Sequence, residues 1–383
     1  MIDALTGIAG LALVGLALWD VFETIVVPRP TPGWLRIGRY VIRWTWRPYR
    51  NIVVRFKTGL ARDSLLGLYA PGAAILLLAV WLAFIVVGYG LILFALRADL
   101  NPTPQTLGDA IYFAGSSILT IGFGDIVATS GIARLVVVIG AATGLGIVAL
   151  VITFLFSLFG SYQRREVAVV TLSARAKAPP SAMLLLLTYA RLDLVDELPA
   201  LFREWEVWTA EVLDTHVSYP LLGYFRSSHD NVSWISSLGA VLDAASLVLT
   251  TVTNVPRGHA KITHRIGTHL VEDITNILGL KGDGSAVDRD EFAVVYAKLG
   301  KVGYELEPED DAWHAFERER SSYAGRLLAM ADYWATPAPV WVSRPSMGES
   351  LAHIRPSETP SDDGAPVTAV ATTADAKGAR TPG

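Results

Sequence analysis

The six residues from Thr120 to Asp125 are those whose types and spacing most directly suggest chemistry. They read Thr-Ile-Gly-Phe-Gly-Asp, so two glycines alternate with two apolar residues and a carboxylate closes the run. Glycine holds a positive φ at little cost, so alternating it with other residues can turn successive carbonyls toward one side. Several such segments around one axis would stack rings of backbone oxygens, which can replace the water shell of a monovalent cation. The run therefore predicts ion coordination by main-chain oxygens.

The residues before this run fit a short supporting helix. Thr106 and Asp109 have the spacing of a capping box, which marks a helix start. Residues 110–119 form an apolar run of about ten residues, which is too short to cross a bilayer. Irregular backbone at membrane depth is tolerated only where it lines a cavity or is buried in protein. We therefore predict a re-entrant pore helix over residues 106–119 and a filter over residues 120–125.

Three longer apolar segments, 4–27, 65–96 and 132–160, each reach the length of about 20 residues that crosses a bilayer. The chain is 52% hydrophobic with a mean hydropathy of +0.40, too apolar for an ordinary soluble protein of 383 residues. Segment 4–27 lacks the basic start of a signal peptide, so we predict an uncleaved helix. The expected fold is an all-α membrane protein with three transmembrane helices, a re-entrant pore helix and filter, and a C-terminal helical cytoplasmic domain.

The central segment resembles the pore of potassium channels. Residues 120–125 match the selectivity filter in the TIGFGD form common among two-pore-domain potassium channels, and the resemblance covers roughly residues 66–162. The whole layout resembles bacterial single-filter members of the family with an extra N-terminal span. The resemblance implies a pore domain over 65–163, with an outer helix 66–96 and an inner helix 132–162. It also implies that K⁺ is bound by the filter residues Thr120, Ile121, Gly122, Phe123 and Gly124, with Asp125 at the outer mouth.

Two residues depart from the family pattern. Phe123 stands where tyrosine is commonest, so one hydroxyl that braces the filter is absent, although phenylalanine occurs there in related channels. Leu119 stands where many members have a second threonine, which makes the cavity roof more apolar and puts conductance in doubt.

The inner helix carries candidate gating residues. Gly144 lies at the spacing of a hinge glycine in the resembled family, and close helix packing is the alternative for it. For Gly140 and Gly146 we favour packing. The family geometry would turn three further side chains toward the cavity, with the last of them a candidate hydrophobic gate: Val148, Ile152 and Phe156.

The chain carries one filter, whereas an axial pore needs four, so the resemblance implies a homotetramer with cyclic symmetry. Transport would be passive, with no reaction catalysed and no cofactor beyond K⁺ as the permeant ion. Two alternatives stay open. One is a poorly conducting, channel-like membrane sensor, motivated by Leu119 and the large C-terminal domain. The other is a potassium transporter subunit, a class that usually carries four filter loops per chain.

Residues 28–64 are strongly basic, so the positive-inside rule predicts that they are cytoplasmic in an inner membrane, with the N-terminus outside. Within them, five arginines recur every three or four residues. A voltage-sensing helix and an amphipathic helix on the anionic inner leaflet are the two interpretations, and we favour the second because Pro48 is expected to interrupt the stripe. The five arginines are Arg36, Arg39, Arg43, Arg47 and Arg50. Asp20 and Glu23 are expected near the headgroups, facing these arginines.

Residues 164–343 are predicted to be a helical cytoplasmic domain, entered through membrane-surface anchors Arg164 and Arg165, and residues 344–383 a disordered tail. Amphipathic spacing predicts helices over 182–208, 232–249 and 310–330, with Ser181 and Ser321 as caps. The stretch around residues 224–226 is expected to be a solvated loop. No ligand of this domain can be assigned. His259, His264 and His269 are five residues apart, which spreads them over different helix faces and argues against a metal site. The net charge of −4 argues against nucleic acid as the main partner.

Overall fold

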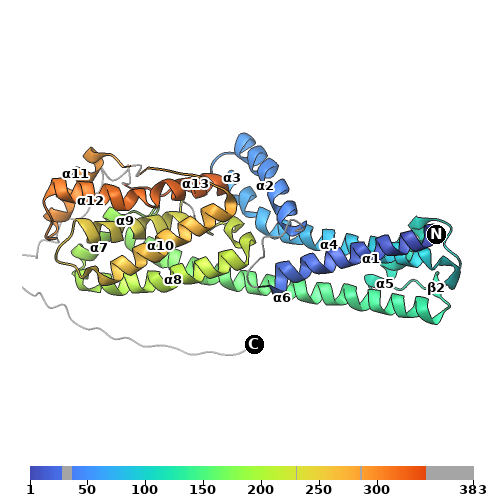
Figure 1. The fold of residues 1–383 in the computed structure, drawn as a ribbon. Helices are drawn as coiled ribbons and strands as arrows, with labels where there is room; N and C mark the ends of the chain where they lie inside the picture. Colours follow the sequence, from blue (N-terminus) through green and yellow to red (C-terminus); the bar gives the residue numbers. More distant parts are fainter. Residues whose placement is uncertain (28–36, 230, 285–286, 342–383) are drawn as a thin grey trace, which may run out of the picture. The chain divides into compact units, whose positions relative to one another are not determined.

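The computed structural model describes residues 1–27, 37–229, 231–284 and 287–341. Three helices in this part are long and apolar enough to cross a membrane, namely Ile2–Val26, Ala61–Ala95 and Gly131–Ala176. They contain α1 (Ile2–Val21) with a π-helical turn (Phe22–Val26), α4 (Tyr69–Ala95) and α6 (Gly131–Ala176). Helix α4 packs along both α1 and α6 (Figure 1). The predicted helical membrane fold with three spans is confirmed.

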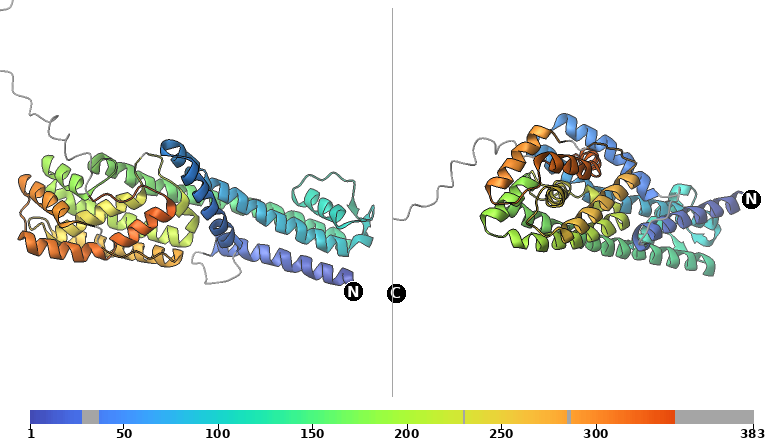
Figure 2. Two further views of the ribbon diagram at one scale, coloured as in Figure 1. Left: turned by 90° about the horizontal axis from the view of Figure 1, so that it is seen from above. Right: turned by 60° about the vertical axis from the view of Figure 1, so that its left-hand side comes forward.

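The chain between α4 and α6 forms a small compact unit at one end of these helices. A 3-10 turn (Arg97–Asp99) leads into β1 (Leu100–Asn101), which pairs antiparallel with β2 (Val127–Ala128). Between the strands lie α5 (Leu107–Ile118) and residues 119–126 (Figure 2). The predicted capping box is present, since the Thr106 side chain accepts from the Asp109 backbone N–H and Asp109 accepts in return. The β1–β2 pair therefore ties together the two ends of the segment that carries residues 120–125.

Polar contacts fix α1 at both of its ends. Near the N-terminus, Asp3 pairs with Arg97, in the 3-10 turn that follows α4. At the other end Asp20 is fully buried and accepts hydrogen bonds from the Trp81 indole at 2.7 Å and from the Gly38 backbone N–H at 3.0 Å. Glu23 is also buried. Asp20 thus joins α1 to α4 and to the start of α2 inside the protein.

The basic segment forms two helices, α2 (Ile37–Phe56) and α3 (Gly59–Gly67). The expectation that Pro48 interrupts the first helix was wrong, because α2 runs through it. Contacts on both sides of the proline hold the helix in place. The Trp46 indole donates to the Tyr333 carbonyl at 3.1 Å, and Arg50 pairs with Asp332 at 2.9 Å. Tertiary packing therefore overrides the local cost of proline in a helix.

The C-terminal helical region contains α7 to α13. Helix α9 lies among the others, with nearly all its side chains buried, and it packs against α6, α7, α10, α12 and α13 (Figure 2). A helix buried on every side is expected to be mostly apolar, and the one charged residue of α9, Asp243, is paired with Arg320 at 2.8 Å. The bounds are α7 (Ala182–Arg191), α8 (Leu198–Ser218), α9 (Trp234–Thr250), α10 (Arg257–Leu278), α11 (Arg289–Lys301), α12 (Glu309–Ser321) and α13 (Ala324–Trp334), with 3-10 turns at Val195–Glu197 and Pro220–Tyr224.

Several predicted boundaries need correction. The stretches 182–208 and 310–330 are each two helices, and α10 and α11 were not anticipated. Ser181 caps α7 as expected, but Ser321 ends α12, where its hydroxyl donates to the Arg318 carbonyl. Helix α6 runs to Ala176, well beyond the predicted end at 162. The predictions for Arg36 and for the tail 344–383 fall outside the described residues.

Candidate ion-coordinating loop and the buried junction on α6

The backbone of residues 120–124 alternates in the sign of φ. The angle is +56° at Thr120, +65° at Gly122 and +79° at Gly124, whereas Ile121 and Phe123 keep negative values. A positive φ is rare for a β-branched residue such as threonine, and it costs roughly 1–2 kcal/mol. Strain of this kind gathers at functional sites. The positive angles at Gly122 and Gly124 are those that the sequence argument expected of the glycines, whereas the positive angle at Thr120 was not anticipated.

The N–H groups of the loop bond back to α5. The backbone nitrogens of Ile121 and Gly122 donate to the Ser116 carbonyl at 2.9 and 3.1 Å, and that of Phe123 donates to the Ser116 hydroxyl at 3.3 Å. Within the described part of the chain, no protein donor is hydrogen-bonded to the carbonyls of residues 120–124. Backbone carbonyls need a partner once they leave water. The loop therefore presents a row of carbonyl oxygens without protein donors, while three of its own N–H groups are bonded to Ser116.

Ser116 was missed by the sequence argument. It is buried and, through its carbonyl and hydroxyl, it holds three consecutive loop residues. A serine near the end of a short helix carries no distinctive sequence signal, and its role depends on the loop folding back over α5.

The side chains of the loop divide between α5 and the outside of the chain. The Phe123 ring stacks on Tyr112, with centroids 6.0 Å apart and planes 9° apart. The Tyr112 hydroxyl also interacts with the Asp125 carboxylate. Phe123 and Ile121 are nonetheless more than half exposed in the single chain. The loop is thus braced from one side only.

Gly144 is a packing residue in this structure. A Cβ built on it would lie 2.5 Å from Ile118 Cγ2 and 2.7 Å from the Ile118 carbonyl oxygen, so only glycine fits. Helix α6 is continuous through it. Gly140 likewise packs on the Tyr89 ring, whereas a Cβ on Gly146 would meet nothing within 4 Å, so the packing expectation for Gly146 fails within one chain.

The candidate gate residues lie on the second half of the apolar part of α6. Val148 is half-buried, and Ile152 and Phe156 are exposed, Phe156 to 75%. These three residues recur every four residues along one face of α6. That they face the cavity stays a prediction.

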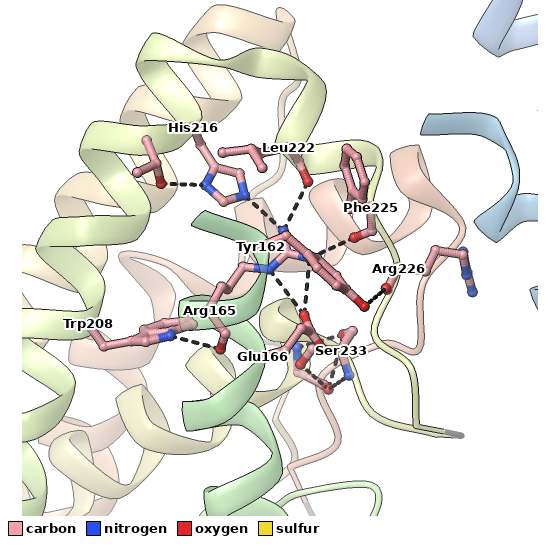
Figure 3. Close-up of polar contacts among 11 residues, drawn as sticks. Tyr162, Arg165, Glu166, Trp208, His216, Leu222, Phe225, Arg226 and Ser233 are labelled. Carbon is pink, nitrogen blue, oxygen red and sulfur yellow. Dashed lines mark hydrogen bonds and ion pairs between the residues drawn. The ribbon is translucent and has the colours of Figure 1, made fainter. Parts of the chain in front are cut away.

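Arg165 lies farther along α6, in a buried polar cluster (Figure 3). Its guanidinium donates to the carbonyls of Leu222 at 3.0 Å and Phe225 at 2.8 Å. It also pairs with the Glu166 carboxylate at 3.1 Å and donates to His216 Nε2 at 3.0 Å. The Arg165 backbone carbonyl accepts from the Trp208 indole at 3.2 Å. Arg165 therefore joins α6 to α8 and to the 3-10 turn that follows it.

His216 is neutral in this arrangement. Its Nδ1 donates to the Val212 carbonyl at 2.8 Å, which leaves Nε2 as the acceptor for Arg165. Burial, and then the nearby Arg165 charge, lower the pKa of His216 well below its ordinary value. The Arg165 guanidinium also faces the rings of Tyr162 and Trp234 at 5.5 and 5.7 Å.

This cluster corrects two predictions. Arg165 is not a membrane-surface anchor, since it is only 2% exposed, whereas Arg164 is exposed as expected. The stretch around residues 224–226 is not a solvated loop. Tyr224 is buried, and Arg226 donates to the Trp334 and Ala335 carbonyls and pairs with Asp63 at 2.8 Å. Residue 230, a little farther along the chain, lies outside the described residues.

The three histidines of α10 and the arginines of α2 each lie in different surroundings. His259 lies near Glu206, His264 is buried against Tyr323, and His269 is exposed. Among the described residues, no group of three or more histidines and carboxylates could hold a metal ion. Of the predicted lipid-facing arginines, Arg50 is engaged with Asp332, while Arg39, Arg43 and Arg47 are exposed.

The loop, its supporting helix and parts of the flanking spans fall within a region that is similar to a known family. Residues 76–161 match the family model of an ion channel. The matched region contains most of α4, all of α5 and the loop, and the first two-thirds of α6. The chain is also similar to the uncharacterized membrane protein YdjJ of Bacillus subtilis (strain 168), with 28% identity over 176 residues, 43% of this chain and 48% of the relative. The chain thus spans about half the length of that relative. No solved structure matches the chain.

Proposed function

We propose that this protein is a homotetrameric, potassium-selective channel that conducts passively. The match to the ion channel family and the three apolar spans support a channel in a membrane. The finer proposal depends on one observation, which is the alternation of φ along residues 120–124 with all three bound N–H groups turned toward Ser116. Carbonyls left without donors beside a membrane-embedded helix suit a dehydrated monovalent cation.

The tetramer follows from the incompleteness of the loop in one chain. Loop side chains and one face of α6 are exposed, including Ile121, Phe123, Leu145 and Phe156. Such exposed apolar area marks an interface with lipid or with other chains. One loop supplies one side of an ion site, so cyclic symmetry of four chains would complete it.

We further propose that the C-terminal helical region lies in the cytoplasm of a cell with an inner membrane and controls α6. The basic α2 and α3 segment favours that side by the positive-inside rule. Helix α6 is one continuous element from the loop to the Arg165 cluster. A movement of α8 relative to α6 would therefore reach the candidate gate residues Ile152 and Phe156.

Ion flux into liposomes containing the purified full-length protein tests this function. A potassium gradient is expected to drive flux and an equal sodium gradient to drive much less. Gly122→Asp and Phe123→Ala are expected to abolish selective conduction, because the first cannot hold φ at +65° without strain and the second removes the Tyr112 stack. Gly131→Asp, at the start of α6 with nothing near its Cα, adds the same charge outside the loop and is expected to conduct.

Wild-type potassium selectivity in both loop variants would contradict the assignment, as would a purified particle whose mass equals one chain. A membrane sensor that conducts poorly is the second candidate, favoured by Leu119, which is 49% exposed next to the loop and would make a cavity roof apolar. If the protein is such a sensor, Leu119→Thr should give a markedly higher flux than the wild type. In an efficient channel the same substitution should change the flux little.

A further inference from the structure

A cavity of about 430 Å³ lies where the three membrane helices meet the C-terminal region. Its wall includes Thr24 from the end of the first span, Leu77 from the start of α4 and Phe154 from α6. The opposite wall comes from the C-terminal region, including Tyr219, Leu221 and Ile277. The size is that of a small-molecule site, and the lining is mainly apolar. It lies at the ends of the spans that are remote from residues 120–125.

The cavity also has a charged side. Arg39 and Arg43, one turn apart on α2, both contribute to the lining. Within the described residues neither arginine has a hydrogen-bond or ion-pair partner, in contrast to Arg50 on the same helix, which pairs with Asp332. Asp273 on α10 is the carboxylate in the lining, and it pairs with His269 at 3.5 Å. Two arginines against one carboxylate leave the lining of this mainly apolar chamber with a net positive charge, so the site is amphipathic.

We propose that this cavity binds an anionic phospholipid, with the acidic headgroup at Arg39 and Arg43 and an acyl chain against Leu77, Ile42 and Phe154. The first span ends at Val26, two residues after the lining residue Thr24, so a lipid of the adjoining leaflet would enter the cavity from that side. Arginine suits a phosphate group because its planar fork donates two parallel hydrogen bonds. The inference is independent of ion selectivity, since it concerns binding at the other end of the spans.

Occupancy of this cavity also bears on α6. Phe154 is 6% exposed, and its ring contacts Tyr219 at 5.6 Å between centroids. The bound chain would therefore contact α6 two residues before Phe156 and, through Tyr219, the turn that carries Leu222 and the Arg165 cluster. The same ligand would thus contact the helix that carries the candidate gate residues and the connection of that helix to the C-terminal region.

The test is binding of a fluorescent short-chain phosphatidic acid to the full-length protein in maltoside micelles, with unlabelled competitors. Phosphatidic acid is expected to compete, while phosphatidylcholine, which shares the chains but not the net charge, and inorganic phosphate, which lacks the chains, are expected to compete poorly. Arg39→Gln and Arg43→Gln should each weaken binding about fivefold. Asp273→Asn should tighten it or leave it unchanged, because it removes a negative charge from the lining.

Arg47→Gln is the matched control, since Arg47 is an exposed arginine on the same helix and does not line the cavity. A general surface attraction would make Arg47→Gln as damaging as Arg43→Gln, and that result would overturn the proposal. Equal competition by phosphatidylcholine or by inorganic phosphate would overturn it as well. Ile42→Trp, which fills the apolar part, should abolish binding while thermal unfolding shows that the variant is folded. None of these readouts requires ion conduction, so a failure here and a failure of the channel assignment remain distinguishable.

Discussion

The loop at residues 120–125 precedes α6, and the Arg165 cluster lies farther along the same helix. The two regions differ in how many of their polar groups find partners within one chain. The loop is bonded to one buried residue, Ser116; within the described residues its carbonyls accept no protein hydrogen bond, and most of its side chains are exposed. Arg165 has four polar partners for its guanidinium, all inside the chain, and is 2% exposed. In the proposed tetramer, one end of α6 would assemble with other copies, whereas the polar contacts at the other end hold a single chain together.

Arg165→Met should have the largest effect on stability. It leaves the Glu166 carboxylate and two backbone carbonyls buried without their donor, and breaking a buried ion pair costs about 3–5 kcal/mol. Denaturant titration of the full-length protein in detergent, followed by tryptophan fluorescence, measures this loss. The double variant Arg165→Met/Glu166→Met should recover part of it, because no buried charge remains unpaired.

Arg164→Met is the control for that experiment. Arg164 is exposed and donates only to Ser161 at 3.2 Å, so its removal should change the unfolding free energy by less than about 0.5 kcal/mol. Equal losses in the Arg164 and Arg165 variants would mean that the cluster does not stabilise the junction.

Gly144→Ala should have a smaller effect, at the boundary between the two regions. The added methyl would overlap Ile118, whose carbonyl precedes the loop, and overpacking of this kind costs about 1–3 kcal/mol. Gly146→Ala, two residues on with open space around it, should be neutral or slightly stabilising in the dissociated chain. Thermal unfolding of both variants in detergent checks this difference. Identical midpoints would show that the α5–α6 contact at Gly144 is dispensable and would restore the hinge interpretation.

The sequence allowed the three spans, the Thr106 cap and the position of the loop to be predicted, because apolar length and capping chemistry are local signals. Three features could not be predicted since they depend on tertiary contacts. Arg165 follows an apolar run, as surface arginines do, and it is buried only by the packing of α8, the turn after α8 and α9. Pro48 breaks an isolated helix but is tolerated where Trp46 and Arg50 anchor both sides. Ser116 acquires its role only from the fold of the loop.

The smallest effect on stability is expected from a change in pH, and it concerns the Arg165 cluster but not the loop. The pKa of His216 is lowered by burial and by Arg165, so below an ordinary value of 6.5 the unfolded chain takes up a proton that the folded chain refuses. Stability is therefore complete above that value and falls as the pH decreases below it, by at most about 1.4 kcal/mol per pH unit for one group. His216→Gln keeps an acceptor for Arg165 but does not titrate. Its unfolding midpoint should drop less than that of the wild type between pH 7.5 and 5.5.

His264 provides the necessary comparison for this experiment. Burial also lowers its pKa, but the charges of Glu319 and Asp243 oppose that shift. His264→Gln should therefore remove a smaller part of the acid sensitivity than His216→Gln. An unchanged pH dependence of unfolding in the His216 variant would mean that other groups cause the loss of stability in acid. The Arg165–His216 contact would then not be responsible for it. The potassium preference of His216→Gln at pH 7.5 should equal that of the wild type, because residues 120–125 share no contact with this cluster.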